Sequence, residues 1–428
     1  MSIRTRECYI GIDFGTSGVR CCAIDNQGAV LREARINLPA PGPSPAGQVE
    51  QDPRLWWQAC LEVLDKLLIN NDLLPKAISI DGTSGTLLLC NDTGHPLGYA
   101  LMYNDSRAAA QAKALSMLAP PHAAVHGASS ALAKLCYLSR NPQPEARYAL
   151  HQADWIVGQL TGCYGISDEN NVLKMGYDPV NRCWPEWLND CPIDMKLLPK
   201  VIPVGEPIAP LARVLCERWQ LTKPPQVIAG TTDSNAATIA CGVKDPGQAA
   251  TALGSTLVLK VFSDHPVFNA NFGVYSHRIG NKWLTGGASN SGGAVLLKYF
   301  SVRRLAELSN LIDATQDSGL DYYPLPDRGE RFPINDPELP PRLLPRPDND
   351  TLFLHGLLEG IARVEYQGYL KLRELGAPYP SSILTSGGGA ANAAWMQIRE
   401  RLLCVPVNAA KHTEAAYGSA LIAAGKVL

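Results

Sequence analysis

The chain has 428 residues, 46% hydrophobic and 18% charged, a composition typical of a packed globular protein of two to four domains. Its 38 Lys and Arg residues nearly balance 40 Asp and Glu residues, so the net charge of −2 excludes nucleic acid or an anionic membrane as a partner held by bulk charge. The 12 cysteines lack a Cys-x-x-Cys pair, and no apolar run reaches about 18 residues. We therefore expect no disulfide framework, no membrane span and a cytoplasmic location.

Short apolar runs that end in turns of small residues recur along the chain. The first strand is expected at 9–13 and the next apolar run at 19–24, with a Gly-rich turn between them, which predicts a hairpin. The hairpin pattern recurs at 77–81 with 86–90 and at 251–253 with 257–261, and further strands are expected at 227–230 and 382–385. The early turns carry Asp and the late ones mostly Gly and Ser, which favours two α/β halves that face each other.

Helices and loops are expected between these turns. Asp52 followed by Pro53 is typical of a helix start, because Asp caps the first turn and Pro suits the first helical position. Apolar residues then follow at helical spacing, and a second helix is expected from about 392 to 403. Segment 39–53 is rich in Pro and Gly and predicts a surface loop. Segment 323–350 holds eight prolines and predicts one long rigid loop.

Two of the small-residue turns could bind phosphate. A turn such as Thr16-Ser17 after a buried strand exposes backbone N–H groups, which form a nest for phosphate oxygens. Asp13 at the end of that strand could hold Mg²⁺ beside the phosphates. Alone, an ordinary hairpin explains this pattern better. The chain also contains a second such turn, Gly254-Ser255-Thr256. Because a triphosphate has to be held from both sides, the two turns together favour phosphate binding over an ordinary hairpin.

Asp233 follows a strand and two threonines and precedes an Ala-rich helical pattern. One interpretation is a general base that takes a proton from a substrate hydroxyl. The other is a helix N-cap, and the two are equally good on local grounds. They are compatible, because this position points the carboxylate into a cleft at the strand ends.

The run Gly387-Gly388-Gly389 followed by Asn392 departs from the dinucleotide-binding fingerprint, and no acidic residue stands about 20 residues further on. Fewer than 50 residues remain, too few for a Rossmann sheet. We interpret the run as a flat surface under a purine, with a plain tight turn as the alternative.

Together these segments resemble the FGGY carbohydrate kinases of the actin/hexokinase/heat-shock ATPase superfamily, over nearly the whole chain. Each motif is weak alone, but their shared order along the chain is specific. The matching segments are 12–17, 50–53 with Trp56 and Trp57, 229–233, 254–256, 329–333 and 387–389.

Departures from the family pattern concern the sugar side. Tyr103 stands where the family has the Trp of Trp-x-Asp-x-Arg, and Tyr137 where it has the Trp after Lys134-Leu135. The chain is shorter than most members. This short form and the segment 81–85, Asp-Gly-Thr-Ser-Gly, look most like the plant and cyanobacterial pentulose kinases, which implies D-ribulose above D-xylulose as acceptor.

The resemblance implies an α/β fold of two ribonuclease-H-like lobes that flank a cleft for ATP and sugar. Residues 1–240, with 414–428 returning, would form the sugar-binding lobe, and 241–413 the nucleotide-binding lobe. Asp233 would be the catalytic base, Asp13 would hold Mg²⁺, and Asp13, Ser84 and Asp233 would bind the sugar. The residues implied for ATP are Thr16, Ser17, Gly254, Ser255, Thr256, Gly388, Gly389 and Asn392. The partner would be a small-molecule sugar, and a homodimer stays open.

Two other classes of protein compete with this interpretation. An actin-like ATPase switch would use the same phosphate turns without sugar chemistry. Asp81, Ser84 and Asp105, an acid-and-hydroxyl lining, favour a polyol pocket instead. A dinucleotide-dependent oxidoreductase is disfavoured by the missing acidic residue.

Overall fold

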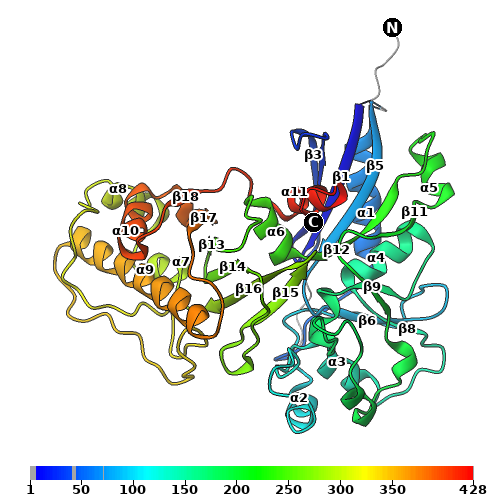
Figure 1. Ribbon diagram of the computed structural model, residues 1–428, viewed down its shortest axis with the longest axis horizontal. Coiled ribbons are helices and arrows are strands. Elements are labelled where there is room, and N and C mark those ends of the chain that lie inside the picture. Colours follow the sequence, from blue (N-terminus) through cyan, green and yellow to red (C-terminus); the bar gives the residue numbers. More distant parts are fainter. Residues whose placement is uncertain (1–5, 41–44, 71, 428) are drawn as a thin grey trace. The chain divides into compact units, whose positions relative to one another are not determined.

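The computed structural model describes residues 6–40, 45–70 and 72–427 (Figure 1). Its contacts divide the chain into two compact units. Unit 1 consists of Met1–Ala240, His277–Asn281 and Glu414–Leu428, and unit 2 of Cys241–Ser276 and Lys282–Thr413. Within the described ranges, no helix has the length and apolar character needed to cross a membrane.

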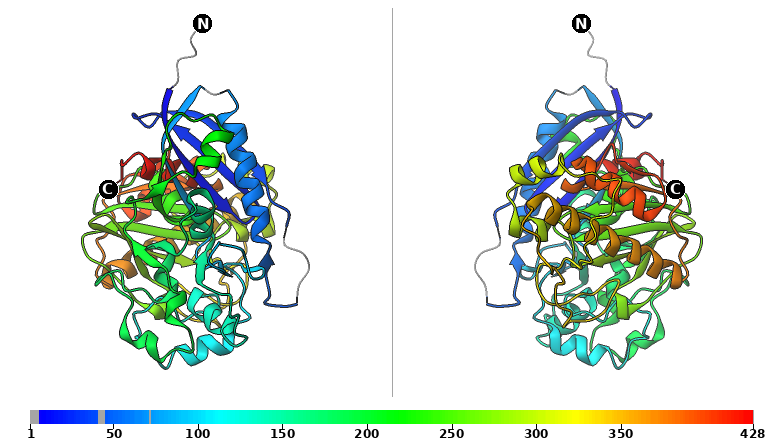
Figure 2. Two further views of the ribbon diagram at one scale, coloured as in Figure 1. Left: turned by 90° about the vertical axis from the view of Figure 1, so that its right-hand side faces the viewer. Right: turned by 90° about the vertical axis from the view of Figure 1, so that its left-hand side faces the viewer.

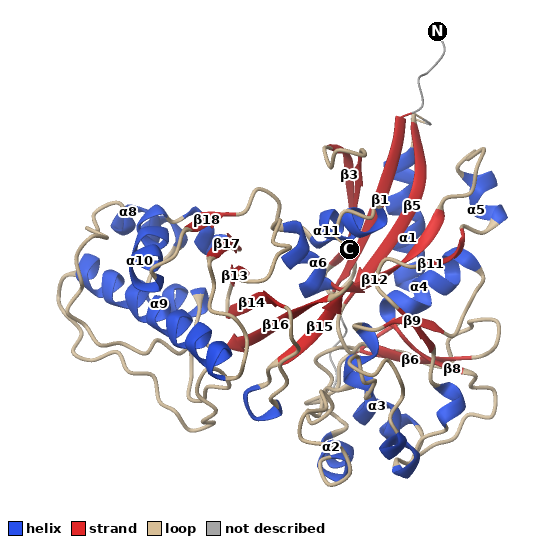
Figure 3. Cartoon of the chain, in the orientation of Figure 1, coloured by secondary structure: helices blue, strands red, loops and turns tan. Residues whose placement is uncertain are grey.

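A six-stranded sheet forms the centre of unit 1, in the order β11-β12-β5-β1-β2-β3 (Figure 3). β1 and β2 pair antiparallel with Asp13 opposite Arg20, so the predicted hairpin is confirmed. β5 lies parallel to β1 on its other side, and β12 lies parallel to β5. The strands are β1 (Arg6–Gly15), β2 (Gly18–Ile24), β3 (Val30–Asn37), β5 (Leu73–Gly82), β11 (Pro207–Pro210) and β12 (Gln226–Thr232).

Helices cover both faces of this sheet, because successive strand residues point to opposite sides. On one face Trp56 of α1 and Trp155 of α4 meet edge to face, with ring centroids 6.3 Å apart, in the same core as Cys21 of β2. On the other face Cys22 packs in a separate core with α6 and α11. These helices are α1 (Pro53–Leu68), α4 (Gln152–Thr161), α6 (Asp233–Ala240) and α11 (Ala415–Ala423).

The start of α1 follows the prediction. The side chain of Asp52 accepts a hydrogen bond from the backbone N–H of Arg54, and Pro53 is the first helical residue. The expected surface loop at 39–53 differs in one respect, because Glu50–Gln51 forms the short strand β4, and residues 41–44 of the loop lie outside the described residues.

The second expected hairpin, between 77–81 and 86–90, is wrong. β6 (Leu87–Cys90) follows β5 along the chain but does not pair with it, since β1 and β12 already occupy both edges of β5. β6 instead belongs to a separate sheet in the order β4-β7-β6-β8. Its other strands are β7 (Ala100–Leu101) and β8 (Tyr148–His151).

The rest of unit 1 is made of short elements around this second sheet. β9 (Ile166–Asp168) and β10 (Lys200–Ile202) pair in parallel. The helices are α2 (Ala109–Leu115), α3 (Ala131–Leu138) and α5 (Arg213–Arg218), with 3₁₀ turns η1 (Asn171–Met175), η2 (Glu186–Asp190) and η3 (Met195–Leu197).

Helix α11 lies unusually close to the sheet and to α6. A side chain at Gly11 of β1 would meet the backbone oxygen of Ala416 at 2.0 Å, and one at Gly418 would meet that of Ala236 at 1.9 Å. Only glycine allows these approaches. The last helix of unit 1 is therefore held at a fixed depth on β1.

Unit 2 repeats five strands of the unit 1 architecture in the order β16-β14-β13-β17-β18. The sheet is extended beside β16 by β15, whose residues from His277 on are grouped with unit 1. The long helix α9 packs beside α10 (Figure 2). The strands are β13 (Gln248–Leu253), β14 (Leu257–Ser263), β15 (Tyr275–Ile279), β16 (Lys282–Ser289), β17 (Ser382–Ser386) and β18 (Val407–Ala409). The helical elements are α7 (Gly293–Tyr299), α8 (Val302–Ser309), α9 (Asp350–Glu374), α10 (Ala393–Leu403), η4 (Ala270–Phe272) and η5 (Gly388–Ala391).

A fully buried ion pair joins the sheet of unit 2 to its helices. Arg399 of α10 donates to both carboxylate oxygens of Glu365 on α9, at 2.6 and 2.7 Å. Thr251 of β13 donates to the same carboxylate at 2.6 Å, and Arg399 also donates to Thr385 of β17 at 2.8 Å. Removal of one partner would leave a buried charge uncompensated.

Residues 323–349 contain no helix or extended strand and are held by isolated bridges, which agrees with the predicted loop up to Asp350, where α9 begins. Glu330 lies at its centre and is buried. Its carboxylate accepts hydrogen bonds from the hydroxyl of Ser289 at 2.5 Å and from the backbone N–H groups of Asn290 and Arg331 at 2.8 and 2.9 Å. The loop is thereby anchored to the end of β16.

Candidate active site

Three carboxyl groups lie at one edge of the unit 1 sheet. Asp13 is near the end of β1, Asp81 near the end of β5, and Asp233 directly after β12. These strands are parallel neighbours, with Asp13 in register with Asp81 and Thr231 in register with Asp81. The carboxyl ends of parallel strands are where α/β proteins place their ligands.

Asp13 is buried with 5% of its surface exposed. The guanidinium of Arg20 lies 3.1 Å from its carboxylate and also 3.4 Å from Glu414. Burial raises the pKa of Asp13, and Arg20 partly opposes that rise. The charge of this carboxylate is partly neutralised by Arg20, and the turn with half-buried Thr16 and exposed Ser17 follows three residues later in the chain.

Asp81 is completely buried, and its pKa is well above the usual range because of burial and of the neighbouring carboxyl of Asp13. Asp233 contributes further repulsion. The hydroxyl of Ser419 on α11 donates to Asp81 at 2.5 Å. The acid cluster is thus completed by a residue more than 300 positions away in the sequence, which no local pattern could reveal.

Asp233 is the first residue of α6 and is half-buried. Its carboxylate accepts a hydrogen bond from the backbone N–H of Ser234 at 2.6 Å. Asp233 is thus the first residue of the helix, and this hydrogen bond is to the adjacent residue rather than to the second or third residue of a capped turn.

The turn that carries Ser84 is held by hydrogen bonds between its neighbour Thr83 and Gln152. The side-chain oxygen of Gln152, the first residue of α4, accepts hydrogen bonds from the backbone N–H and the hydroxyl of Thr83, at 3.1 and 2.8 Å. The hydroxyl groups of Thr83 and Thr86 are 2.6 Å apart. Ser84 lies half-buried in this turn. The role of Gln152 could not be predicted from the sequence, because polar residues are common at the first position of a helix.

In unit 2, the turn Gly254-Ser255-Thr256 joins the antiparallel strands β13 and β14. The beginning of α7 packs against it, since Gly293 and Ala294 donate backbone hydrogen bonds to the carbonyl groups of Gly254 and Ser255 at 2.8 and 3.1 Å. Gly254 and Ser255 are exposed. The turn is therefore braced on one side and open on the other.

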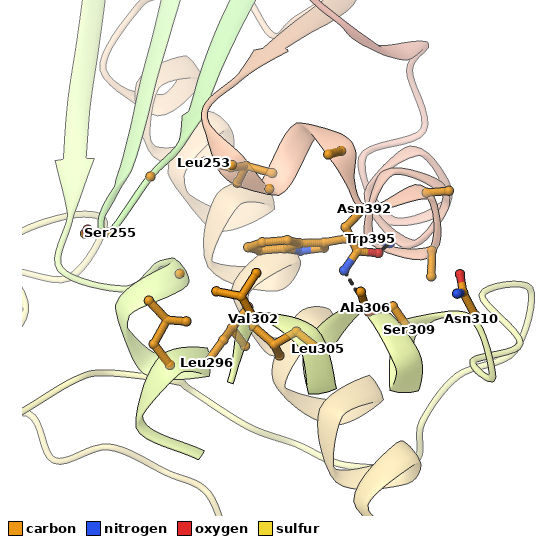
Figure 4. A pocket seen from close by; sticks show the side chains of 18 residues that line it. Leu253, Ser255, Leu296, Val302, Leu305, Ala306, Ser309, Asn310, Asn392 and Trp395 are labelled. Atoms are coloured by element: carbon orange, nitrogen blue, oxygen red, sulfur yellow. Dashed lines mark hydrogen bonds between the residues drawn. The ribbon is translucent and has the colours of Figure 1, made fainter. Parts of the chain in front are cut away.

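This turn borders a cavity of about 530 Å³ that lies wholly within unit 2 (Figure 4). Gly254, Ser255, Gly388, Gly389 and Asn392 all line it, whereas Thr256 belongs to the turn but not to the cavity wall. The volume and the mostly apolar wall suit a nucleoside.

Helix α8 forms the opposite wall. Val302, Leu305, Ala306 and Ser309 line the cavity at helical spacing, and the indole ring of Trp395 faces Val302 and Leu305 (Figure 4). The sequence analysis missed this helix, because its spacing marks an amphipathic helix without indicating a ligand.

Asn392 joins the two walls. Its side-chain oxygen accepts from the backbone N–H of Trp395 at 3.0 Å, which caps α10, and its amide nitrogen donates to the hydroxyl of Ser309 at 2.8 Å. The expected helix at 392–403 is confirmed as α10, with Asn392 as its cap.

The donor set fits a magnesium ion that arrives with phosphates. No group of three or more His, Cys, Asp or Glu side chains suited to a metal occurs in the described part of the chain. Asp13 offers one carboxylate, which also accepts a hydrogen bond from the guanidinium of Arg20. Mg²⁺ is commonly held by one or two carboxylates together with substrate phosphates and water.

An α/β unit with carboxyl groups at its strand ends and a second α/β unit with a nucleoside-sized cavity are the features expected of an enzyme that acts on a nucleotide and a polar substrate. Comparison with protein families agrees. The N-terminal domain of the FGGY family of carbohydrate kinases matches residues 8–240, and the C-terminal domain of that family matches residues 246–426. The chain belongs to this family and is a sugar kinase, with ATP as the phosphate donor.

Individual relatives agree with this membership. The chain is 26% identical over 408 residues to a xylulose kinase of Escherichia coli (strain K12), covering 91% of this chain and 84% of the relative. It is 26% identical over 447 residues to a glycerol kinase of Gloeobacter violaceus, covering 97% and 87%. Its fold matches the crystal structure of a xyloylose kinase from Brucella ovis with a TM-score of 0.88 at 24% identity, covering 98% of this chain and 90% of the other.

Proposed function

We propose that this kinase transfers the γ-phosphate of ATP to a terminal hydroxyl of a ketopentose, with D-ribulose as the preferred acceptor. The observation that carries the proposal is the position of Asp233 at the end of β12, beside the buried carboxyl of Asp81 and the Arg20-paired carboxylate of Asp13. An acid cluster of this kind suits hydroxyl recognition and proton removal.

In the proposed reaction, Asp233 takes the proton of the acceptor hydroxyl as its oxygen attacks the γ-phosphorus. A new P–O bond forms to the sugar, the bond to ADP breaks, and the charge released stays on ADP. Asp13, Ser84 and Asp233 hydrogen-bond the sugar hydroxyls. Mg²⁺ held by Asp13, when bound, neutralises charge on the phosphates.

The nucleotide is assigned to the two turns and the cavity. Backbone N–H groups at Thr16, Ser17, Ser255 and Thr256 bind phosphate oxygens. The N–H of Gly254 donates to the carbonyl oxygen of Thr256 at 3.2 Å, so Gly254 contributes by shaping the turn. The adenosine end occupies the cavity of unit 2, against residues Gly388, Gly389 and Asn392. The size of the cavity and its position next to the Gly254–Thr256 turn support this assignment.

D-xylulose is the second candidate acceptor. Five similar proteins, from Escherichia coli, Klebsiella pneumoniae and staphylococci, are xylulose kinases by name. D-ribulose and D-xylulose differ in one hydroxyl configuration, and a pocket that hydrogen-bonds a hydroxyl discriminates strongly against an acceptor that misplaces it.

The test is a coupled assay of ADP release with a panel of ketopentoses, polyols and hexoses. D-ribulose is expected to give the highest kcat/KM. ATP turnover that no sugar or polyol stimulates would contradict the proposal and favour an ATPase switch.

A variant tests the proposed base. Asp233→Ala is expected to lower kcat by roughly 10²- to 10⁴-fold while ATP still binds. Asp92→Asn, at an exposed position of unit 1, is the control and should behave as the parent protein. A near-normal rate in Asp233→Ala would remove Asp233 from the role of base.

A further inference from the structure

Lys134 in α3 is a completely buried lysine whose charge faces main-chain carbonyl groups rather than a paired carboxylate. Its ammonium group donates to the carbonyl oxygen of Gly85 and to that of Met102, each at 2.7 Å. Lysine is among the residues least often fully buried. Two short bonds to carbonyl groups at such a site therefore call for a functional explanation.

The two carbonyl groups belong to segments that are distant in sequence. Gly85 ends the turn that carries Ser84, between β5 and β6. Met102 begins the segment 102–107 after β7, and its carbonyl oxygen also accepts the backbone N–H of Asp105 at 2.9 Å. Lys134 is thus a tie between the Ser84 turn and the segment 102–107.

Segment 102–107 is itself held by charge. The carboxylate of Asp105 accepts from the backbone N–H of Val49 at 2.7 Å and from the guanidinium of Arg107 at 2.7 Å. Arg107 also donates to Glu50 at 2.6 Å and lies over the ring of Tyr137, 5.8 Å from its centroid. The segment is rigid on this side, so Lys134 connects the Ser84 turn to a fixed frame.

The charges around Lys134 do not compensate its burial. Burial lowers its pKa to about 7, Asp105 opposes that effect, and Lys174 and Arg107 add to it. A buried charge without full compensation is costly for stability, and an apolar side chain of similar size would often be neutral or favourable. The cost of keeping Lys134 therefore argues against a purely structural role.

We infer that Lys134 is a positioning residue, which holds the Ser84 turn at a fixed distance from segment 102–107 and so sets which acceptor hydroxyl arrangement the pocket accepts. The inference rests on the proposed sugar-kinase site of Ser84. Lys134 itself touches no substrate, because its side chain is completely buried.

The first measurement is independent of the reaction. In Lys134→Met the side chain keeps a similar length but loses its donors. Amide hydrogen exchange is expected to speed up together in peptides that cover 82–86 and 102–107, and to stay unchanged in unit 2. Unchanged exchange in either unit 1 peptide would overturn the tie. Lys200→Met, at an exposed position of β10, is the control.

The second measurement reads the acceptor. Lys134→Met is expected to raise the KM for the preferred ketopentose about 10- to 100-fold and to reduce its discrimination between D-ribulose and D-xylulose, with the KM for ATP unchanged. An equal loss of activity with all acceptors at unchanged KM values would indicate a merely structural role. If the parent protein phosphorylates no ketopentose, the proposed function fails, while the exchange result still decides the tie.

Chemical rescue separates the ammonium group from side-chain packing. In Lys134→Ala, added n-propylammonium should enter the vacated space and restore the acceptor KM in a saturable way, whereas an uncharged propanol should not. Should Lys134→Met fail to fold, Lys134→Gln, which keeps one amide donor, is measured in its place by hydrogen exchange. Normal exchange and normal acceptor discrimination in Lys134→Ala without added amine would refute the inference.

Discussion

Adjacent glycines in the cavity of unit 2 allow a sharp test of its proposed assignment to ATP. A side chain at Gly389 would lie 2.7 Å from the side chains of Leu253 and Trp395, whereas one at Gly388 would meet nothing within 4 Å. Neither residue has a left-handed backbone. The same Gly→Ala change therefore produces a collision at one position and an added methyl group in open space at the other.

The size of the effect follows from these distances. Carbon atoms pack best at about 3.5–4.0 Å, so Gly389→Ala must displace two buried neighbours by roughly 1 Å. Such overpacking typically costs about 1–3 kcal/mol. For a unit of this size each kcal/mol lowers Tm by roughly 2–4 °C, so a fall of about 2–12 °C is expected.

The assay combines thermal unfolding without nucleotide and the KM for ATP. Gly389→Ala should lower Tm and raise the KM, because Trp395 forms part of the cavity wall. Gly388→Ala should leave Tm nearly unchanged and raise only the KM, because its methyl group would occupy space intended for the nucleotide. A normal ATP KM in both variants would refute the assignment of this cavity to ATP, and an unchanged Tm in Gly389→Ala would refute the packing argument.

Two further variants test buried charges. Glu365→Gln should destabilise unit 2 by about 3–5 kcal/mol in chemical unfolding, because Arg399 would be left buried without its anionic partner; a loss below about 1 kcal/mol would contradict this view of the pair. Asp81→Asn should make the protein more stable than the parent at neutral pH, and the difference should shrink as the pH falls toward about 4. The sign follows because the raised pKa of Asp81 stabilises the folded state only while the carboxyl is protonated; a difference that grows toward acid pH in urea unfolding would contradict it.

Much of the fold was predictable because strand and turn signals are local. The β1–β2 hairpin, the Asp52 cap and the start of α10 at Asn392 could each be recognised within a few residues. The pairing of β6 could not, since the choice of its partner depends on β1 and β12 already flanking β5.

Some residues of the candidate site have a local signal in the sequence, and others depend on contacts between distant segments. Asp13 and Asp233 stand out because each follows a buried strand. Ser419, which donates to Asp81, comes from a helix with no polar pattern of its own, and Lys134 lies in a short apolar helix where nothing local indicates its two carbonyl partners. Long-range neighbours of this kind depend on the assembled sheets rather than on spacing along the chain.

The return of α11 to unit 1 has a consequence for the order in which the protein is made. All of unit 2 lies between Ala240 and Glu414 in the sequence, so it is synthesised before the last segment of unit 1. Until then β1 lacks its covering helix and Asp81 lacks the hydroxyl of Ser419. Unit 1 therefore reaches its complete packing only after all of unit 2 has been synthesised, although most of its residues leave the ribosome first.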